Sequence, residues 1–178
     1  MNHWSKDFPK KVGAQLQATP FFEGFNVEDN LKLFSTFYQS PLTNEEMDEV
    51  LKRYRLLDAK KTFASKLSLG QQKRLAIIIT TLHNPEFVIL DEPSAGLDPS
   101  GQRDVQNMIH SLKRQGKSIL FSSHDMLEVK NTADRVLVMD KGTLLENGKP
   151  LELLEKYKAK DLEELFNILI NKEENQYV

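Results

Sequence analysis

The sequence predicts an α/β fold in which helices cover a parallel sheet and a helical block precedes most of the strands. Three short apolar runs, FVIL, SILFS and RVLVM, lie at residues 87–90, 118–122 and 135–139. Charged segments with a helical pattern separate them, over residues 99–115 and 125–133. Continuous apolar strands that alternate with helices are typical of a parallel sheet buried on both faces.

The composition narrows the class of protein. The chain has 178 residues, enough for one domain with a small appendage, and 39% of them are hydrophobic, which allows a packed core. Lys plus Arg is 24 against Asp plus Glu at 26, so no bulk attraction to nucleic acid is expected. The lack of cysteine excludes disulfides and cysteine-ligated zinc. No apolar run could span a bilayer and no secretory signal is present, which predicts a cytoplasmic protein.

A short strand and an aromatic loop come first. The stretch KKVGAQLQ, residues 10–17, predicts a strand that runs into a polar turn at Gln17. The loop ATPFFEGFN, residues 18–26, follows and contains three phenylalanines. Gln17 stands at a strand end, where its amide could reach a metal-bound water, although one glutamine at such a place signifies little by itself.

Residues 26–84 predict three helices. Asn26 followed by Asp29 resembles an N-cap pattern, and Thr43 with Glu46 is a capping box. The third helix follows Ser68. Spacing at i, i+3, i+4 and i+7 defines the apolar faces of the second and third helices, which are Met47, Val50, Leu51 and Tyr54, and Leu75, Ile78, Ile79 and Leu82.

An acidic pair closes the apolar run FVIL. Asp91 and Glu92 therefore stand at the carboxyl end of a buried parallel strand, the edge at which open α/β sheets bind ligands. Two adjacent acids there can divide the work, because one can hold Mg²⁺ through water while the other polarises the attacking water. The alternative interpretation is a strand that ends in a solvated acidic turn.

Two further motifs flank this pair in the sequence. SLGQQKR begins a helix with a serine hydroxyl that we expect to be free, and with Gly70, so a phosphate could approach its N-terminal N–H groups. A capped helix with nothing bound is the commoner case for a single Ser-x-Gly. SAGLD, residues 94–98, predicts a tight turn at Gly96 and an N-cap at Asp98, as in many ordinary strand-to-helix loops.

His124 ends the next strand, in FSSHD, and is expected at the same sheet edge as the acidic pair if strands 87–91 and 118–122 are neighbours. A lone histidine at a strand end is more often structural. Turn signals at 140–142 and 147–148 predict a small hairpin after the last parallel strand, and two short helices follow from Pro150.

In this order, Gln17, LSLGQQKR, FVILDEP, SAGLD and SSHD resemble the nucleotide-binding domain of ABC transporters. Five elements in sequence are far more specific than any one of them. The resemblance implies a P-loop NTPase-like parallel-sheet core, present in part at 1–25 and 85–148. It further implies an inserted helical subdomain at 26–84 and a C-terminal helical tail at 149–178.

The resemblance also assigns roles to individual residues, with ATP and Mg²⁺ as cofactors. The residues of catalysis are Glu92 as general base, His124 as switch histidine and Gln17 as the Q-loop glutamine. The residues that contact nucleotide are Ser68, Gly70 and Gln71 of the signature motif and Asp98 of the D-loop. The Mg²⁺ ligands are Asp91, as the Walker B aspartate, and Gln17.

The sequence departs from the family pattern at two points. Leu69 replaces the first glycine of the common Ser-Gly-Gly-Gln signature, while Ser68 and Gly70 are kept. The phosphate-binding pattern Gly-x-x-x-x-Gly-Lys-[Ser/Thr] does not occur, since the one similar triplet, at Gly116, has Ser111 where the first glycine is needed. We therefore expect a chain without the N-terminal part of the domain, either truncated or encoded separately.

The family implies head-to-tail dimers of two such domains, identical or different, on the inner face of the membrane. A transmembrane permease would be the partner, and the sequence resembles the multidrug and ABC-2 export subfamily. Segment 18–37 falls where family members contact the permease. One alternative is a non-catalytic module that supplies its signature half-site to another ATPase subunit. Another is a soluble ATPase acting on DNA or ribosomes, although the coiled-coil insertion or tandem cassettes of such relatives do not occur.

Overall fold

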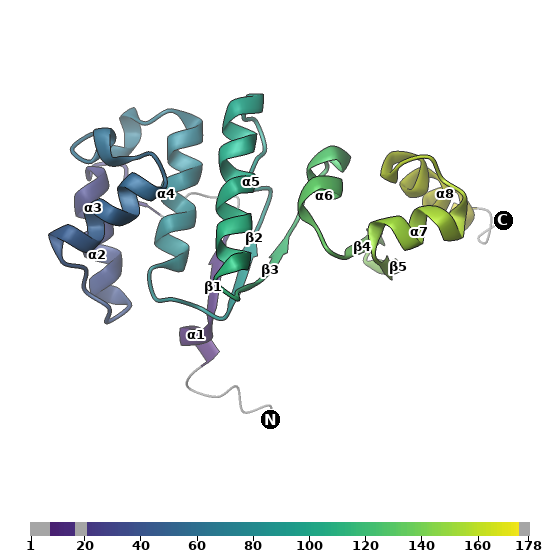
Figure 1. Ribbon diagram of the computed structural model, residues 1–178, viewed down its shortest axis with the longest axis horizontal. Helices are drawn as coiled ribbons and strands as arrows, with labels where there is room; N and C mark the ends of the chain where they lie inside the picture. Colours follow the sequence, from purple (N-terminus) through teal and green to yellow (C-terminus); the bar gives the residue numbers. More distant parts are fainter. Residues whose placement is uncertain (1–7, 17–20, 175–178) are drawn as a thin grey trace. The chain divides into compact units, whose positions relative to one another are not determined.

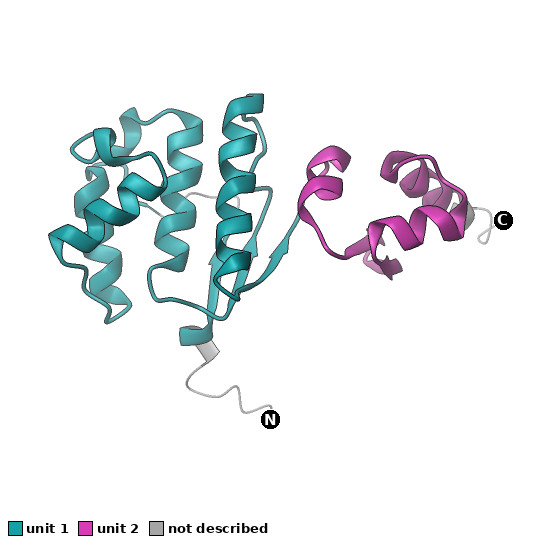
Figure 2. Ribbon diagram, viewed as in Figure 1, with its two compact units in different colours: residues 1–123 teal, residues 124–178 magenta. Residues whose placement is uncertain are grey.

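The computed structural model describes residues 8–16 and 21–174 and divides into two compact units. Unit 1 comprises Met1–Ser123 and unit 2 comprises His124–Val178 (Figure 2). Each unit has its own hydrophobic cluster among the described residues, so each is described by itself.

Unit 1 has three parallel strands in the order β1-β2-β3. They are β1 (Val12–Gln15), β2 (Phe87–Leu90) and β3 (Ser118–Phe121). Gln15 lies opposite Leu90, and Leu90 lies opposite Phe121, so the three strands end level with one another. The prediction that the runs at 87–90 and 118–121 are adjacent parallel strands is therefore confirmed.

Helices account for most of the rest of unit 1, with 3₁₀ turns at Leu57–Ala59 and Ala64–Lys66. They are α1 (Phe8–Lys11), α2 (Val27–Phe37), α3 (Asn44–Arg53), α4 (Leu69–Thr81) and α5 (Pro99–Arg114). Figure 1 shows α4 and α5 side by side along the sheet, with α2 and α3 beyond α4. Helix α4 therefore lies between the sheet and the α2–α3 pair.

Local signals in the sequence explain where these helices begin. The Asn26 side chain accepts the Asp29 N–H at 2.8 Å, and Thr43 forms a capping box with Glu46. The apolar face expected on α3 is buried at Met47 and Leu51. Helix α4 is buried more widely than one face, because Ile77 is as enclosed as the predicted Ile78.

Helix α4 packs unusually close to strand β1 at Gly13. A Cβ atom added there would lie 2.3 Å from the backbone oxygen of Thr80, a separation that real Cβ atoms do not show. Glycine at this position therefore lets the helix backbone approach the strand directly. The close approach holds the C-terminal end of α4 against the sheet.

Unit 2 contains α6 (Met126–Thr132), β4 (Val136–Asp140), β5 (Thr143–Gly148), α7 (Pro150–Tyr157) and α8 (Leu162–Glu174). The expected hairpin and the two C-terminal helices are confirmed. The expectation that RVLVM joins the parallel sheet is wrong, since β4 pairs antiparallel with β5 in a separate two-stranded sheet. Val138 is buried, whereas Leu137 and Met139 are exposed, so this apolar run has only one covered face.

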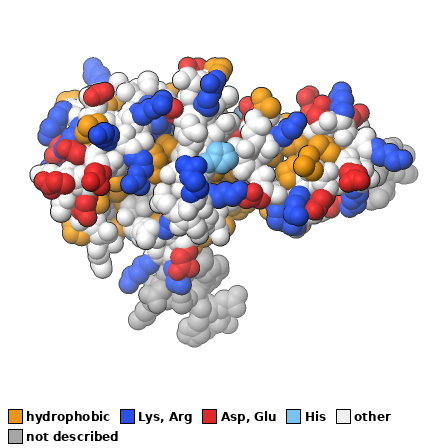
Figure 3. Space-filling view, in the orientation of Figure 1, with side chains coloured by type: hydrophobic (Ala, Val, Ile, Leu, Met, Phe, Trp, Pro, Cys, Tyr) orange, Lys and Arg blue, Asp and Glu red, His pale blue; other side chains and the backbone are white. Residues whose placement is uncertain are grey.

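The outer surface shows no dominant sign of charge on the face drawn in Figure 3, where Lys and Arg side chains alternate with Asp and Glu side chains over both units. This agrees with the formal net charge of −2. Within residues 8–16 and 21–174, no helix is long and apolar enough to cross a bilayer.

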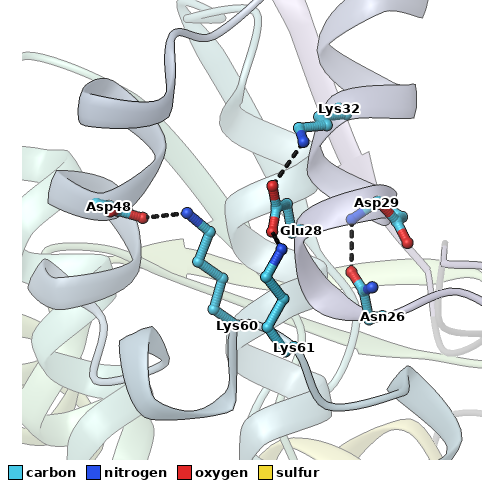
Figure 4. A network of polar contacts seen from close by, with 7 residues as sticks. All are labelled: Asn26, Glu28, Asp29, Lys32, Asp48, Lys60 and Lys61. Atoms are coloured by element: carbon cyan, nitrogen blue, oxygen red, sulfur yellow. Dashed lines mark hydrogen bonds and ion pairs between the residues drawn. The ribbon is translucent and has the colours of Figure 1, made fainter.

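A network of ion pairs ties α2 to the segment before α4 (Figure 4). The buried carboxylate of Glu28 pairs with Lys32 on the next turn of α2 and with Lys61, and Lys60 bonds Asp48 of α3 at 2.6 Å. The hydrogen bond from Lys32, followed by that from Lys61, lowers the pKa of Glu28 from 4.5 to about 2, against the opposing effect of burial. Glu28 is therefore ionised in the folded protein at neutral pH.

We expect Glu28→Gln to lower the free energy of unfolding by about 1–3 kcal/mol at pH 7, because two lysines lose their charged partner. A folded-state pKa below the unfolded value stabilises the protein above pH 4.5, and this stabilisation is lost as the pH falls towards 2. Urea unfolding of wild type and variant between pH 7 and pH 2 measures the difference. Glu49→Gln, an exposed change on α3, is the control, and a difference that stays constant across this range would contradict the prediction.

Candidate functional site

The acidic pair follows β2 at the level where the three parallel strands of unit 1 end. The N–H of Asp91 donates to the backbone oxygen of Gln15, in β1, at 2.9 Å. The N–H of Ser122 donates to the backbone oxygen of Leu90 at 3.0 Å. The Ser122 hydroxyl then donates to Oδ1 of Asp91 at 2.6 Å and accepts the N–H of Glu92 at 2.9 Å. The acids are thus held between the ends of both neighbouring strands.

Glu92 has an uncommon backbone conformation. Its φ is +47°, in the left-handed region that non-glycine residues seldom adopt, at a cost on the order of 1 kcal/mol. Its carbonyl oxygen accepts a hydrogen bond from Nζ of Lys73 at 3.0 Å. Hydrogen bonds on both sides of its α-carbon therefore hold this residue where the strand turns.

The sequence did not identify Lys73 and Ser122 as part of the site. Lys73 is buried in α4, and this burial lowers its pKa, while the nearby charges of Asp91 and Glu92 act in the opposite direction. A lysine at a helical position whose neighbours one turn later are apolar, as in QQKRLAI, is the signal that could have indicated a buried ammonium group. Ser122 carries no comparable signal.

Helix α4 begins with a reciprocal cap. The hydroxyl oxygen of Ser68 accepts the N–H of Gln71 at 3.3 Å, and the Gln71 side chain accepts the N–H of Ser68 at 2.9 Å. The expectation of a free Ser68 hydroxyl is therefore wrong, because the hydroxyl oxygen caps the helix, as Ser68 and Gln71 together form a capping box. Its hydrogen can still be donated. The N–H groups of Leu69 and Gly70 make no hydrogen bond within the described residues.

The SAGLD segment lies against this helix end. Gly96 has a φ of +76°, as the predicted tight turn requires, and a Cβ there would meet the Leu69 side chain at 3.2 Å. A Cβ at Gly70 would meet only ordinary contacts, the nearest being Arg74 at 3.8 Å and Leu97 at 3.9 Å. The structure therefore brings the Ser68 motif and the SAGLD loop together.

Asp98 acts as the N-cap of α5, as predicted, since its Oδ1 accepts the N–H of Gly101 at 2.9 Å. Gln17 lies outside the described residues. His124 is the first residue of unit 2, so its position relative to Asp91 and Glu92 is not described. Gln15, at the end of β1, is buried, and its Oε1 has no hydrogen-bond partner in the part of the chain described.

The groups present fit a nucleotide and Mg²⁺ in part. Mg²⁺ prefers oxygen ligands and is usually bound by one or two carboxylates, together with water and phosphate oxygens. The adjacent carboxylates of Asp91 and Glu92 meet this requirement, although the described residues contain no cluster of three or more metal-binding side chains. The two unbonded N–H groups at the start of α4 are suited to an anion.

The known proteins that this chain resembles include ATP-binding proteins of ABC transporters. The profile of the ABC transporter family matches residues 1–95. The lantibiotic transport ATP-binding protein SrtF of Streptococcus pyogenes is 32% identical over 164 residues, which are 92% of this chain and 68% of SrtF. The bacitracin transport ATP-binding protein BcrA of Bacillus licheniformis is 35% identical over 89% of this chain and 51% of BcrA.

A third relative, the uncharacterized ABC transporter ATP-binding protein YdbJ of Bacillus subtilis, is 36% identical over 75% of this chain. The matched part is 43% of YdbJ, so the chain matches about half the length of YdbJ and BcrA. A solved structure of the ATP-binding subunit of an ABC transporter superposes with a TM-score of 0.77 at 22% identity, over 92% of this chain and 72% of that one.

Proposed function

Because this chain belongs to the ABC transporter family, as an ATP-binding domain with the P-loop NTPase fold, we propose that it couples ATP binding and hydrolysis to export by a separate membrane permease. SrtF and BcrA are transport proteins for a lantibiotic and for bacitracin, and export as the direction is proposed from the resemblance to the multidrug and ABC-2 export subfamily. The proposed place of action is the cytoplasmic face of the membrane.

The observation that carries the proposal is the way the acidic pair is held. Asp91 would bind Mg²⁺ through water, and Glu92 would accept a proton from the attacking water. Bound Mg²⁺ would neutralise charge on the phosphates. The Ser122 hydroxyl bonds the carboxylate of Asp91 and the backbone N–H of Glu92, so it ties the Asp91 side chain to the Glu92 backbone.

The start of α4 is proposed to act on nucleotide held by a second domain. Ser68, Gly70 and Gln71 lie at a helix N-terminus whose partial positive charge favours phosphate, and the Leu69 and Gly70 N–H groups can donate to it. Two domains would therefore close head to tail, each supplying its acidic pair to one ATP and its α4 terminus to the other. Closure would then depend on bound nucleotide.

Three further residues have proposed roles that rest on the family pattern. His124 would hydrogen-bond the terminal phosphate, and Gln17 would reach the metal-bound water. Asp98 would contribute to the nucleotide site from the SAGLD loop, in addition to capping α5.

An exposed aromatic cluster is the proposed contact for the permease. It consists of Phe22, Phe25, Phe34, Phe37 and Tyr38. The ring centroids of Phe25 and Phe34 lie 5.7 and 6.1 Å from that of Phe22, and those of Phe37 and Tyr38 lie 6.3 and 6.5 Å from that of Phe34. Phe22 is 51% exposed and Phe37 is 67% exposed. Large apolar side chains that form a continuous exposed patch commonly mark a protein interface.

The cluster predicts that replacing Phe22 and Phe37 together by serine reduces copurification of the permease by at least about tenfold, since both rings would lose buried contact area. Quantitative pull-down from membranes measures the amount retained. Leu151→Ser, an exposed change on α7, is the control. A double variant that retains the permease as well as wild type does would show that the contact lies elsewhere.

Mg-ATP titration tests the nucleotide site. We expect Asp91→Asn to weaken Mg-ATP binding by the assembled transporter at least about tenfold, because a metal-binding carboxylate is lost, while binding of ATP without Mg²⁺ changes little. Asp58→Asn, an exposed change in a 3₁₀ turn, is the control. Equal Mg-ATP affinity in wild type and Asp91→Asn would contradict the metal role.

The same titration on the purified 178-residue chain addresses the alternative function. Binding that depends on Asp91 would mean that this chain holds nucleotide by itself. No binding would favour a chain that contributes its α4 terminus to a site on another subunit.

A further inference from the structure

The backbone of Glu92 differs in kind from the other left-handed residues of the described chain. Five other non-glycine residues have positive φ, and each lies just after a helix or in the hairpin turn, where this conformation is common: Gln39, Arg55, Asn84, Lys141 and Lys158. Glu92 instead lies two residues after the end of β2 and just before the SAGLD loop. Its conformation therefore needs another cause.

Two side chains from different elements hold the peptide groups on either side of the Glu92 α-carbon. Ser122, after β3, accepts the N–H of Glu92 at 2.9 Å and donates to Asp91 at 2.6 Å. Lys73, in α4, donates to the carbonyl oxygen of Glu92 at 3.0 Å. That oxygen also accepts the N–H of Ala95 at 3.3 Å, which comes from within the following turn.

Burial of a lysine ammonium group is energetically unfavourable, so a purely structural hydrogen bond would seldom use one. Lys73 is only 6% exposed, and burial of its ammonium group lowers its pKa. Its charge lies near those of Asp91 and Glu92, which act in the opposite direction on that pKa. A buried cation beside an acidic pair is typical of a site where the position of the acids matters.

We propose that Lys73 and Ser122 are positioning residues that hold Glu92 in its left-handed conformation and thereby aim its carboxylate at the attacking water. The proposal rests on the role of Glu92 in hydrolysis proposed above. The direction of a side chain follows from the backbone torsions at its α-carbon, so release of either peptide group would let the carboxylate swing. A displacement of about 1 Å at a reacting group can lower a rate by about 10²-fold.

Steady-state ATP hydrolysis by the assembled transporter tests this proposal. We expect Lys73→Met, which keeps an apolar stem but removes the donor, to lower kcat by about 10–100-fold with KM for Mg-ATP changed less than about threefold. Ser122→Ala should also lower kcat, and KM can change with it because the bond to Asp91 is removed as well. Ser122→Thr, which keeps the hydroxyl at an exposed position, should retain most of the wild-type rate. Lys52→Met, an exposed change on α3, is the control.

A double-variant experiment separates positioning from general damage. If Lys73 acts through the Glu92 carboxylate, Lys73→Met should cause almost no further loss in a Glu92→Gln background. A loss of the same size in both backgrounds would overturn the proposal. So would a wild-type rate in both Lys73→Met and Ser122→Ala.

The outcomes also distinguish the two proposals from each other. If Glu92→Gln by itself leaves the rate unchanged, the proposed catalytic role fails and takes this inference with it. If Glu92→Gln lowers the rate but Lys73→Met and Ser122→Ala do not, only the positioning role fails. Should Lys73→Met not fold, Ser122→Ala measured with and without Glu92→Gln still decides the question, because a loss that arises through the Ser122–Asp91 bond would persist in the Glu92→Gln background.

Discussion

Glu92→Gln is expected to slow ATP hydrolysis by the assembled transporter by ~10²–10⁴-fold, the range usual for loss of a general base. The amide cannot accept a proton, yet it has nearly the shape of the carboxylate. The backbone bonds of Glu92 to Ser122 and Lys73 do not involve the side chain, so we expect them to survive the change. Steady-state phosphate release measures the rate, and Mg-ATP binding should persist.

Glu49→Gln, the same chemical change on the exposed side of α3, should leave the rate unaltered. A loss of less than about threefold for Glu92→Gln would reject the general-base role, given the range just stated. That result would favour the alternative in which this chain lends only its α4 terminus to a site on another subunit. The next variant distinguishes these two cases.

Gly70→Asp is expected to reduce hydrolysis by at least about 10²-fold without lowering the melting temperature. A carboxylate at this position would repel the phosphates and occupy their path to the α4 N–H groups. The fold should tolerate the change, because a Cβ at Gly70 comes no closer than 3.8 Å to any neighbour. An acidic residue in the first turn of a helix is also favourable to the helix itself.

Asn44→Asp is the matched control, since it places an acidic residue at an exposed position in the first turn of another helix, α3. Hydrolysis and thermal unfolding should be measured on the same preparations. Full activity in Gly70→Asp would exclude a phosphate contact at this helix end. Loss of activity in Gly70→Asp together with a normal rate in Glu92→Gln would indicate that the chain acts only in trans.

Local signals in the sequence were sufficient for most of the elements. The caps at Asn26, Thr43 and Asp98 depend on side chains within three residues of the helix start, so their outcome does not need the rest of the fold. The apolar runs of β2 and β3 likewise indicated two parallel strands, but the expected burial holds only for β2, since no residue of β3 is buried and Leu120 is 44% exposed. The prediction that RVLVM joins the parallel sheet failed because an apolar run does not indicate whether both faces of its strand are covered. In β4 only one face is covered.

The candidate site was likewise predicted from the sequence only in part. The sequence placed Asp91 and Glu92 at the end of a parallel strand, and the structure has them there. The expectation of a free Ser68 hydroxyl was wrong, although the capping box could have been recognised from Ser68 and Gln71 alone. Nothing in the sequence indicated that Lys73, which precedes Glu92 by nineteen residues, bonds its backbone.

The sequence by itself determined the family, the parallel strands at 87–90 and 118–121, the helix starts and the acidic pair, since each depends on neighbours along the chain. Only the tertiary structure decided the left-handed turn at Glu92 and the side chains that hold it. The absence of a side chain at Gly13 allows α4 to pack closely against β1. The register of β2 with β3 brings Ser122 beside Asp91. These contacts join residues far apart in the chain, and only packing of the helix and strands onto one another creates them.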